Sequence, residues 1–166
     1  GDGVQENASP KILSIDIETR PATAYTWQAY DTNIGYEQII EPGGMICFAA
    51  KFVGEPEIHF YSNWTHSHGE MVRAAHALLS ESDAVLTFNG DRFDLPKLKG
   101  EFILEGLDMP PPIPSIDALK TVKKFGFFMN RLAFIGPLLK VGDKIKTEGF
   151  ELWSKVLAGD PVARKK

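Results

Sequence analysis

The sequence predicts an α/β domain built on a mixed sheet, in which three antiparallel strands are continued by parallel strands and helices cover both faces. Residues 11–64 hold three strand-like segments without a helical period, whereas helical and short apolar segments alternate after residue 70. The 166 residues, 43% hydrophobic and 24% charged, have the composition of a soluble globular chain of one domain. We therefore expect a polar lead over residues 1–10 and a single domain over residues 11–166.

The first strand is expected over residues 11–19, where apolar and polar side chains alternate. Successive side chains of a strand point to opposite faces, so every second residue shares a face. One face carries Leu13, Ile15 and Ile17, and the other carries Ser14, Asp16 and Glu18.

Residues 20–42 have no clear period and hold Tyr25, Trp27, Tyr30 and Tyr36. A connection of this length indicates either a functional insertion or a disordered one. Its rings fit stacking on unpaired bases, and they equally fit packing over the edge of the sheet.

The middle of the chain changes from hairpins to crossovers. Residues 44–53 and 58–64 are expected to form an antiparallel hairpin, and residues 70–80 have the apolar spacing of an amphipathic helix. A short buried strand over 84–88 then leads into a helix with Pro96 in its first turn. The inner face of this helix is expected to hold Leu95, Leu98, Phe102 and Ile103.

The last third is predicted to be mostly helical. A short strand near Ile116 continues into a helix, a second helical pattern over 129–140 is interrupted at Gly136-Pro137, and a third covers 149–160. This order of elements is the layout of the ribonuclease H-like fold.

Several function classes are excluded by what the sequence lacks. No apolar run approaches the roughly 20 residues of a membrane helix, and the first residues have no apolar core of a signal peptide. No phosphate-binding loop, nucleophile elbow or dinucleotide fingerprint is present. The single cysteine, Cys47, cannot form an internal disulfide and is expected to be a buried apolar residue. We expect a cytoplasmic protein with no membrane partner.

Charge is divided unevenly along the chain. Residues 119–147 carry seven cations and one anion, a net charge of +6, which leaves −10 for the rest of this −4 chain. A basic stretch of this kind favours a polyanionic partner such as nucleic acid, although solvated helix faces also carry many lysines. The residues expected to hold a substrate backbone are Lys120, Lys123, Lys124, Lys144 and Lys146.

Asp16 and Glu18 are the first candidate site residues. Two positions apart on a strand, they project from one face with about 7 Å between them. A solvated strand face explains many such pairs, but two unpaired acids on a central strand repel each other unless a cation lies between them. Carboxylate oxygens suit Mg²⁺ or Mn²⁺.

The second candidate site is the segment FNGDRFDLP, residues 88–96. A buried strand ends there, a glycine allows a tight turn, and Asp94 comes just before a helix that starts with proline. Taken alone, Asp94 fits a helix cap.

Together, Asp16-x-Glu18 in a strand and Asn89-x-x-x-Phe93-Asp94 in a strand-to-helix turn resemble the first two motifs of the DEDD, or DnaQ-like, 3′–5′ exonucleases. The later segments SIDALK and GDKIKTEGFELW are similar to predicted exonucleases related to the proofreading domain of family B DNA polymerases, which are common in bacteria and phages. The resemblance covers about residues 11–160, nearly the whole chain.

The resemblance implies a phosphodiesterase that trims DNA from the 3′ end with two Mg²⁺ or Mn²⁺ ions about 4 Å apart. By matching position, Asp16 bridges both ions, Glu18 binds one and helps to orient the attacking water, and Asp94 holds the other. Asn89 and Phe93 are expected at the substrate. The implied partners are single-stranded or frayed DNA 3′ ends and, beyond them, a polymerase or other replication or repair proteins.

The family's third motif, a Tyr or His a few residues before an Asp, is expected after Ala163, and the sequence ends at Lys166. We therefore expect either a chain truncated at its C-terminus or one that lacks the fourth carboxylate. Two alternatives stay open: a ribonuclease on the same fold, and a non-catalytic nucleic-acid-binding module.

Overall fold

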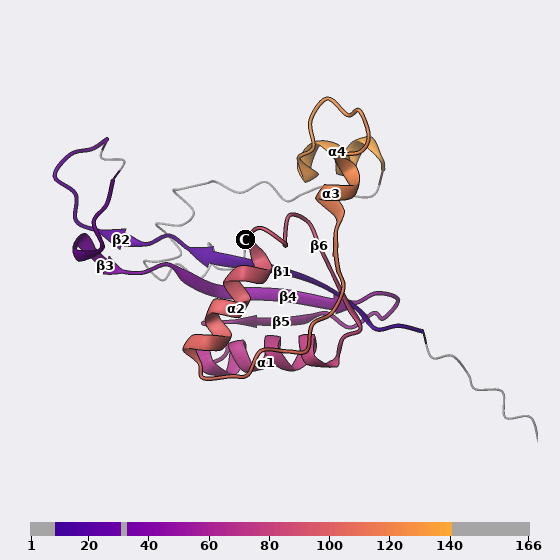
Figure 1. Ribbon diagram of the computed structural model, residues 1–166, viewed down its shortest axis with the longest axis horizontal. Coiled ribbons are helices and arrows are strands. Elements are labelled where there is room, and N and C mark those ends of the chain that lie inside the picture. Colours follow the sequence, from indigo (N-terminus) through magenta and orange to yellow (C-terminus); the bar gives the residue numbers. More distant parts are fainter. Residues whose placement is uncertain (1–8, 31–32, 141–166) are drawn as a thin grey trace, which may run out of the picture. The chain divides into compact units, whose positions relative to one another are not determined.

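The structure is a computed structural model that describes residues 9–30 and 33–140 (Figure 1). The chain forms two compact units, Gly1–Thr121 and Val122–Lys166, which are described separately below. One domain over residues 11–166 stays a prediction, because the described part of the second unit ends at Lys140.

A five-stranded mixed sheet is the framework of the first unit, with the strand order β5-β4-β1-β6-β7. Its strands are β1 (Ile12–Arg20), β4 (Gly44–Phe52), β5 (His59–Ser62), β6 (Ala84–Thr87) and β7 (Ser115–Asp117). β4 lies antiparallel to β1 and β5, whereas β6 runs parallel to β1 and β7. The predicted mixed sheet is confirmed, with its antiparallel part first in the chain and its parallel part second.

A β-bulge interrupts the pairing of β1 with β4. Glu18 lies opposite Cys47 but Thr19 lies opposite Met45, so β4 has one extra residue, Ile46, at this point. The extra residue turns Met45 to the buried face, where it is 1% exposed. The bulge therefore comes directly after the second candidate carboxylate.

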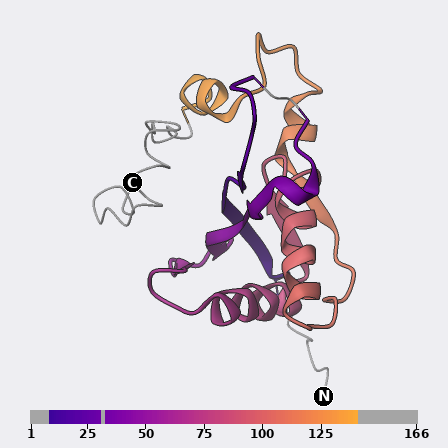
Figure 2. The ribbon, with the colours of Figure 1, turned by 90° about the vertical axis from the view of Figure 1, so that its left-hand side faces the viewer.

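Two helices pack on the apolar face of this sheet, α1 (His68–Glu81) and α2 (Asp94–Leu104) (Figure 2). α1 begins with a capping box between Ser67 and Glu70. Both helices contribute to one core with the apolar side chains of β1 and β4. Ile103, expected on the inner face of α2, is instead 68% exposed, because the buried face of this helix follows Leu98 and Phe102.

A second, smaller sheet lies in the insertion after residue 20, where the sequence has no clear period. β2 (Thr23–Ala24) pairs antiparallel with β3 (Ile39–Glu41), and the single turn η1 (Tyr36–Gln38) precedes β3. Figure 1 shows this pair as an arm that projects beyond the ends of β1 and β4.

The end of the described chain is helical, as predicted. α3 (Ala118–Val122) follows β7 directly, and α4 (Leu132–Leu138) lies in the second unit. α4 runs through Gly136 and Pro137, so the predicted interruption there is wrong. A proline this close to a helix end forfeits one bond, and the N–H of Leu139 still reaches the carbonyl of Ile135. The predicted helix over 149–160, Lys144 and Lys146 lie outside the described residues.

Candidate functional site

Asp16 and Glu18 lie on the face of β1 opposite the core. Ile15 and Ile17 are buried on the core side, and both acidic residues are exposed. The alternation predicted from the sequence is therefore present in the structure, and it separates the apolar half of β1 from its acidic half.

The turn between β6 and α2 brings the second motif to the same place. Asn89 adopts the left-handed conformation, with φ of 63°. At Gly90, a Cβ atom would overlap the buried side chain of Thr87, so only glycine fits without a shift. The tight turn ends at Asp94, the first residue of α2.

Asp94 is buried against β1, 5% exposed, and its Oδ2 accepts a hydrogen bond from the N–H of Ile17 at 3.2 Å. The pKa of the Asp94 carboxyl is raised to about 6, first by burial and then by the charge of the nearby Asp16 carboxylate and a side-chain hydrogen bond with it. Two motifs 78 residues apart therefore place two carboxyl groups against each other.

Glu18 belongs to the same acidic face. It lies opposite Cys47 in the ladder, and the thiol pKa of Cys47 is raised to about 11, first by burial and then by the charges of Glu18 and Asp16. Cys47 is half-buried and its thiol stays protonated at neutral pH, which agrees with the expectation of an unreactive residue.

The sequence predicts that Asp16, Glu18 and Asp94 converge in one metal-sized pocket. Asp16 and Asp94 are brought together. Within residues 9–30 and 33–140, however, no three His, Cys, Asp or Glu side chains are gathered closely enough to hold a metal ion. A three-carboxylate centre therefore stays a prediction.

Asp117 is a site residue that the sequence reasoning missed. Its buried carboxylate accepts hydrogen bonds from the N–H groups of Asn89 at 2.7 Å, Asp91 at 3.3 Å and Leu119 at 3.0 Å. The end of β7 thereby fixes the turn that carries Asn89. The sequence SID offers a local signal for a cap on α3, but none for a contact 28 residues away.

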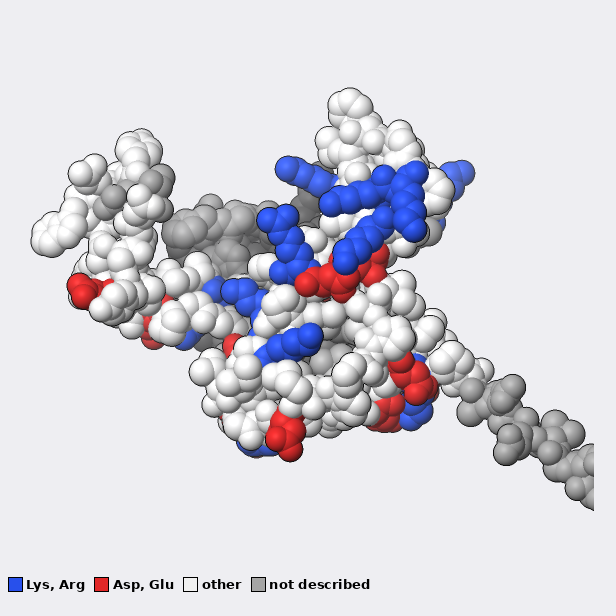
Figure 3. All heavy atoms as spheres, in the orientation of Figure 1, with Lys and Arg blue, Asp and Glu red and all other residues white. Residues whose placement is uncertain are grey.

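The remaining predicted substrate residues lie in different settings. Phe93 is 43% exposed, and the ammonium of Lys97 lies 5.9 Å from its ring centre. Lys120 forms an ion pair with Asp91, whose pKa is lowered first by Lys120 and then by Ser115. Lys123 and Lys124 are exposed in the second unit, where Figure 3 shows basic side chains gathered.

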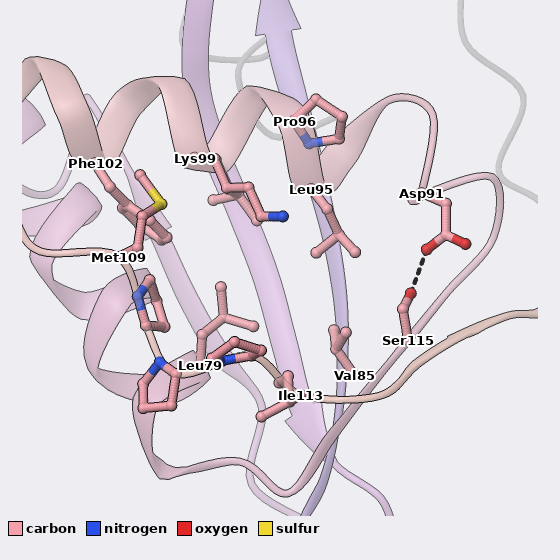
Figure 4. Close-up of a pocket in the computed structure, with 14 residues that line it drawn as sticks. Leu79, Val85, Asp91, Leu95, Pro96, Lys99, Phe102, Met109, Ile113 and Ser115 are labelled. Carbon is pink, nitrogen blue, oxygen red and sulfur yellow. Dashed lines mark hydrogen bonds between the residues drawn. The ribbon is translucent and has the colours of Figure 1, made fainter.

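A cavity of about 500 Å³ lies between α2 and the strap over residues 109–115 (Figure 4). Its walls are mainly apolar, and Asp91 and Ser115 meet at one end through a hydrogen bond. None of the three candidate carboxylates lines it. The acidic face of β1 and this cavity are therefore separate features.

Comparison with known families decides the classification. The profile of the RNase H superfamily matches residues 37–146, which is more than half of the chain. The chain belongs to the RNase H superfamily. The matched region contains β4 to α4 of this RNase H-like domain, including Asp94 and Asp117, and begins after Asp16 and Glu18.

A solved structure supports the same fold over a longer range. The family B DNA polymerase from the hyperthermophilic archaeon Pyrobaculum calidifontis superposes with a TM-score of 0.67, covering 95% of this chain at 13% identity. The RNase H-like chain spans only 22% of that polymerase. A search of curated proteins finds no match. The predicted ribonuclease H-like fold and its likeness to the family B polymerase group are confirmed at the level of fold.

Two further predictions concern a membrane-spanning helix and the location of the protein in the cell. Among the residues that the structure describes, no helix has the length and apolar character needed to cross a bilayer. The cytoplasmic location stays a prediction.

Proposed function

We propose that this RNase H-like domain is a metal-dependent 3′–5′ exonuclease acting on DNA. The observation that carries the proposal is the meeting of Asp16 with Asp94, because it joins the two sequence motifs of the DnaQ-like pattern at one point. The nuclease fold and the superfamily's general use of divalent metal ions support it.

The donor set suits a hard divalent cation. Two carboxyl groups in contact, one of them buried, are unfavourable when both are ionised, which is why the pKa of Asp94 is raised. A cation removes this cost, and carboxylate oxygens are the ligands that Mg²⁺ and Mn²⁺ prefer. Asp16, Asp94 and Glu18 would hold two ions; when bound, such ions activate water and neutralise charge at the leaving oxygen.

The chain's own residues provide the frame for this chemistry. The N–H of Ile17 donates to Oδ2 of Asp94 and so holds that carboxyl group against β1. Asn89 and Phe93 lie in the turn that leads into Asp94, and we propose both as contacts of the substrate. Single-stranded or frayed 3′ ends are the proposed substrate, and a polymerase or a replication or repair protein is the proposed partner.

The test is a cleavage assay with single-stranded DNA labelled at its 5′ end, with Mn²⁺ or Mg²⁺, using the protein that carries this domain. We expect a ladder of shortening products for wild type and none for Asp16→Ala or Asp94→Asn. The matched control is Asp83→Asn: Asp83 is an exposed carboxylate that accepts from the N–H of Lys11 at the other end of β1.

Other outcomes separate the alternatives. A folded Asp16→Ala protein that retains full activity rejects the proposed site. Cleavage of RNA but not DNA by wild type favours the ribonuclease. Two results together favour the non-catalytic module. Wild type then binds DNA and RNA without cleaving either, and it binds Mn²⁺ no more tightly than Asp16→Ala does.

A further inference from the structure

The arm between β1 and β4, defined by residues 21–30 and 33–43, carries a large apolar surface that the proposed nuclease site does not use. Its most exposed rings are Tyr25 at 75%, Trp27 at 93%, Tyr30 at 94% and Tyr36 at 82%. Its aliphatic residues Ile34, Ile39 and Ile40 are between 41% and 49% exposed. Surfaces of this kind mark interaction sites on soluble proteins.

Hydrogen bonds within the arm hold its two strands together. The N–H of Tyr25 donates to the carbonyl of Gln38 at 2.8 Å, and Nε2 of Gln38 donates back to the carbonyl of Tyr25 at 2.9 Å. Oε1 of Gln38 also accepts from the N–H of Gly35 at 2.8 Å. Tyr25 and Tyr36 are therefore carried on a hydrogen-bonded hairpin, which lowers the entropy lost when they bind a partner.

The chemistry of the arm favours protein over nucleic acid. Residues 21–43 contain no Lys or Arg and three acids, Asp31, Glu37 and Glu41. On the face shown in Figure 3, no basic side chain lies on the projecting part of the arm. Single-strand binding sites combine aromatic rings with a positive groove, and aliphatic side chains offer no stacking plane. Three tyrosines and a tryptophan without lysine are instead typical of the centre of a protein interface.

We propose that the arm binds the same arm of a second copy of this chain. Four aromatic side chains bury about 150–250 Å² each, or roughly 600–1,000 Å² per copy. A standard protein interface needs about 800 Å² per partner, so the rings alone approach that area.

The strand β3 supplies a symmetric contact. It pairs with β2 on one side only in the two-stranded sheet of the described chain, which leaves its other edge open for pairing. Antiparallel pairing of β3 with itself about Ile40 places Glu41 opposite Ile39 of the second copy. The acids of the two copies therefore do not face each other, and Arg20 remains beside Glu41 at 3.5 Å.

Sedimentation equilibrium tests this association without any nuclease activity. We expect wild type to have twice the 18.4 kDa mass of one chain at tens of micromolar protein. The variant Tyr25→Ser/Trp27→Ser/Tyr36→Ser should dimerise at least tenfold more weakly with unchanged circular dichroism. The control Leu104→Ser, which removes an 84% exposed side chain on α2, should leave the dimer intact. A monomeric wild type, or a triple variant that dimerises equally well, overturns the proposal.

Disulfide trapping gives a second measurement in case the triple variant misfolds. Cys47 is the single cysteine of the chain, so Ile40→Cys in a Cys47→Ser background leaves one thiol per copy. Pairing about Ile40 brings the two thiols within disulfide distance, and mild oxidation should link most of the protein. Val53→Cys, 56% exposed and outside the arm, is the control and should link much less. Equal linking of both variants overturns the symmetric pairing. If the protein is a monomer that binds oligo(dT), and the triple variant binds it more weakly, the rings belong to a nucleic-acid site instead.

Discussion

Asp94 opens α2 and also faces a second carboxyl group, so its ionisation affects both the helix and the acidic face. Because its pKa is raised from 3.8 to about 6, the folded metal-free protein binds a proton more tightly than the unfolded chain does. The resulting stability is fully present below about pH 4 and is lost as the pH rises through 6.

We predict that metal-free wild type loses up to about 3 kcal/mol of unfolding free energy between pH 4 and pH 7.5 through this group. Asp94→Asn keeps an oxygen for the N–H of Ile17 but cannot ionise, so its stability should change less over the same range. Urea unfolding at several pH values measures both. Parallel curves for the two proteins would show that the pKa of Asp94 is not raised.

Divalent metal should reverse this trend. Metal ligands must be deprotonated, so protons and Mn²⁺ compete for Asp94 and Asp16. We predict that Mn²⁺ raises the melting temperature of wild type more at pH 7.5 than at pH 5, and raises that of Asp16→Ala little at either pH. An equal rise in both proteins would mean that the ion binds elsewhere.

At the scale of elements, the β6–α2 turn depends on close contact between backbone and side chains. A methyl group at Gly90 would overlap Thr87, whereas one at Gly100 meets nothing within 4 Å. We predict that Gly90→Ala destabilises the domain by about 1–3 kcal/mol through overpacking. Gly100→Ala, inside α2, should stabilise it by about 0.5–1 kcal/mol. Denaturant unfolding of the two variants should therefore show shifts of opposite sign.

The elements predicted from the sequence are those with a buried face. β1, β4, α1 and α2 alternate or repeat apolar residues over nine or more positions. The predicted bounds of β1, β4 and α1 lie within two residues of the observed ones, and α2 has Pro96 in its first turn, as predicted. The strands of the arm are two and three residues long with no buried residue, so no periodicity could reveal them. The role of Asp117 could not be predicted for a different reason. Its hydrogen bonds from Asn89 and Asp91 depend on the parallel pairing of β6 with β7, which the local sequence does not reveal.

At the scale of the whole molecule, the uneven distribution of charge predicts that the basic segment binds the backbone of single-stranded DNA. Lys120 is engaged by Asp91, whereas Lys123 and Lys124 are exposed. We predict that Lys123→Gln/Lys124→Gln lowers the slope of log affinity against log salt for single-stranded DNA by about 1.4, at 0.7 per phosphate contact. Lys11→Gln, which removes a cation paired with Glu81, is the control. Unchanged affinity and slope would identify the basic segment as a solvated face.

The hydrogen bonds that fix the acidic site have a consequence for sequence change. The carboxylates of Asp94 and Asp117 accept from main-chain N–H groups at Ile17, Asn89, Asp91 and Leu119. Every amino acid except proline supplies such a donor. These four hydrogen bonds can therefore persist when the side chain at a donor position changes. Substitution of Asp94 or Asp117 removes the accepting carboxylate and breaks them. A saturation library selected for folding should tolerate side-chain changes at position 91, at the cost only of the contacts of Asp91 with Lys120 and Ser115, and should reject proline there.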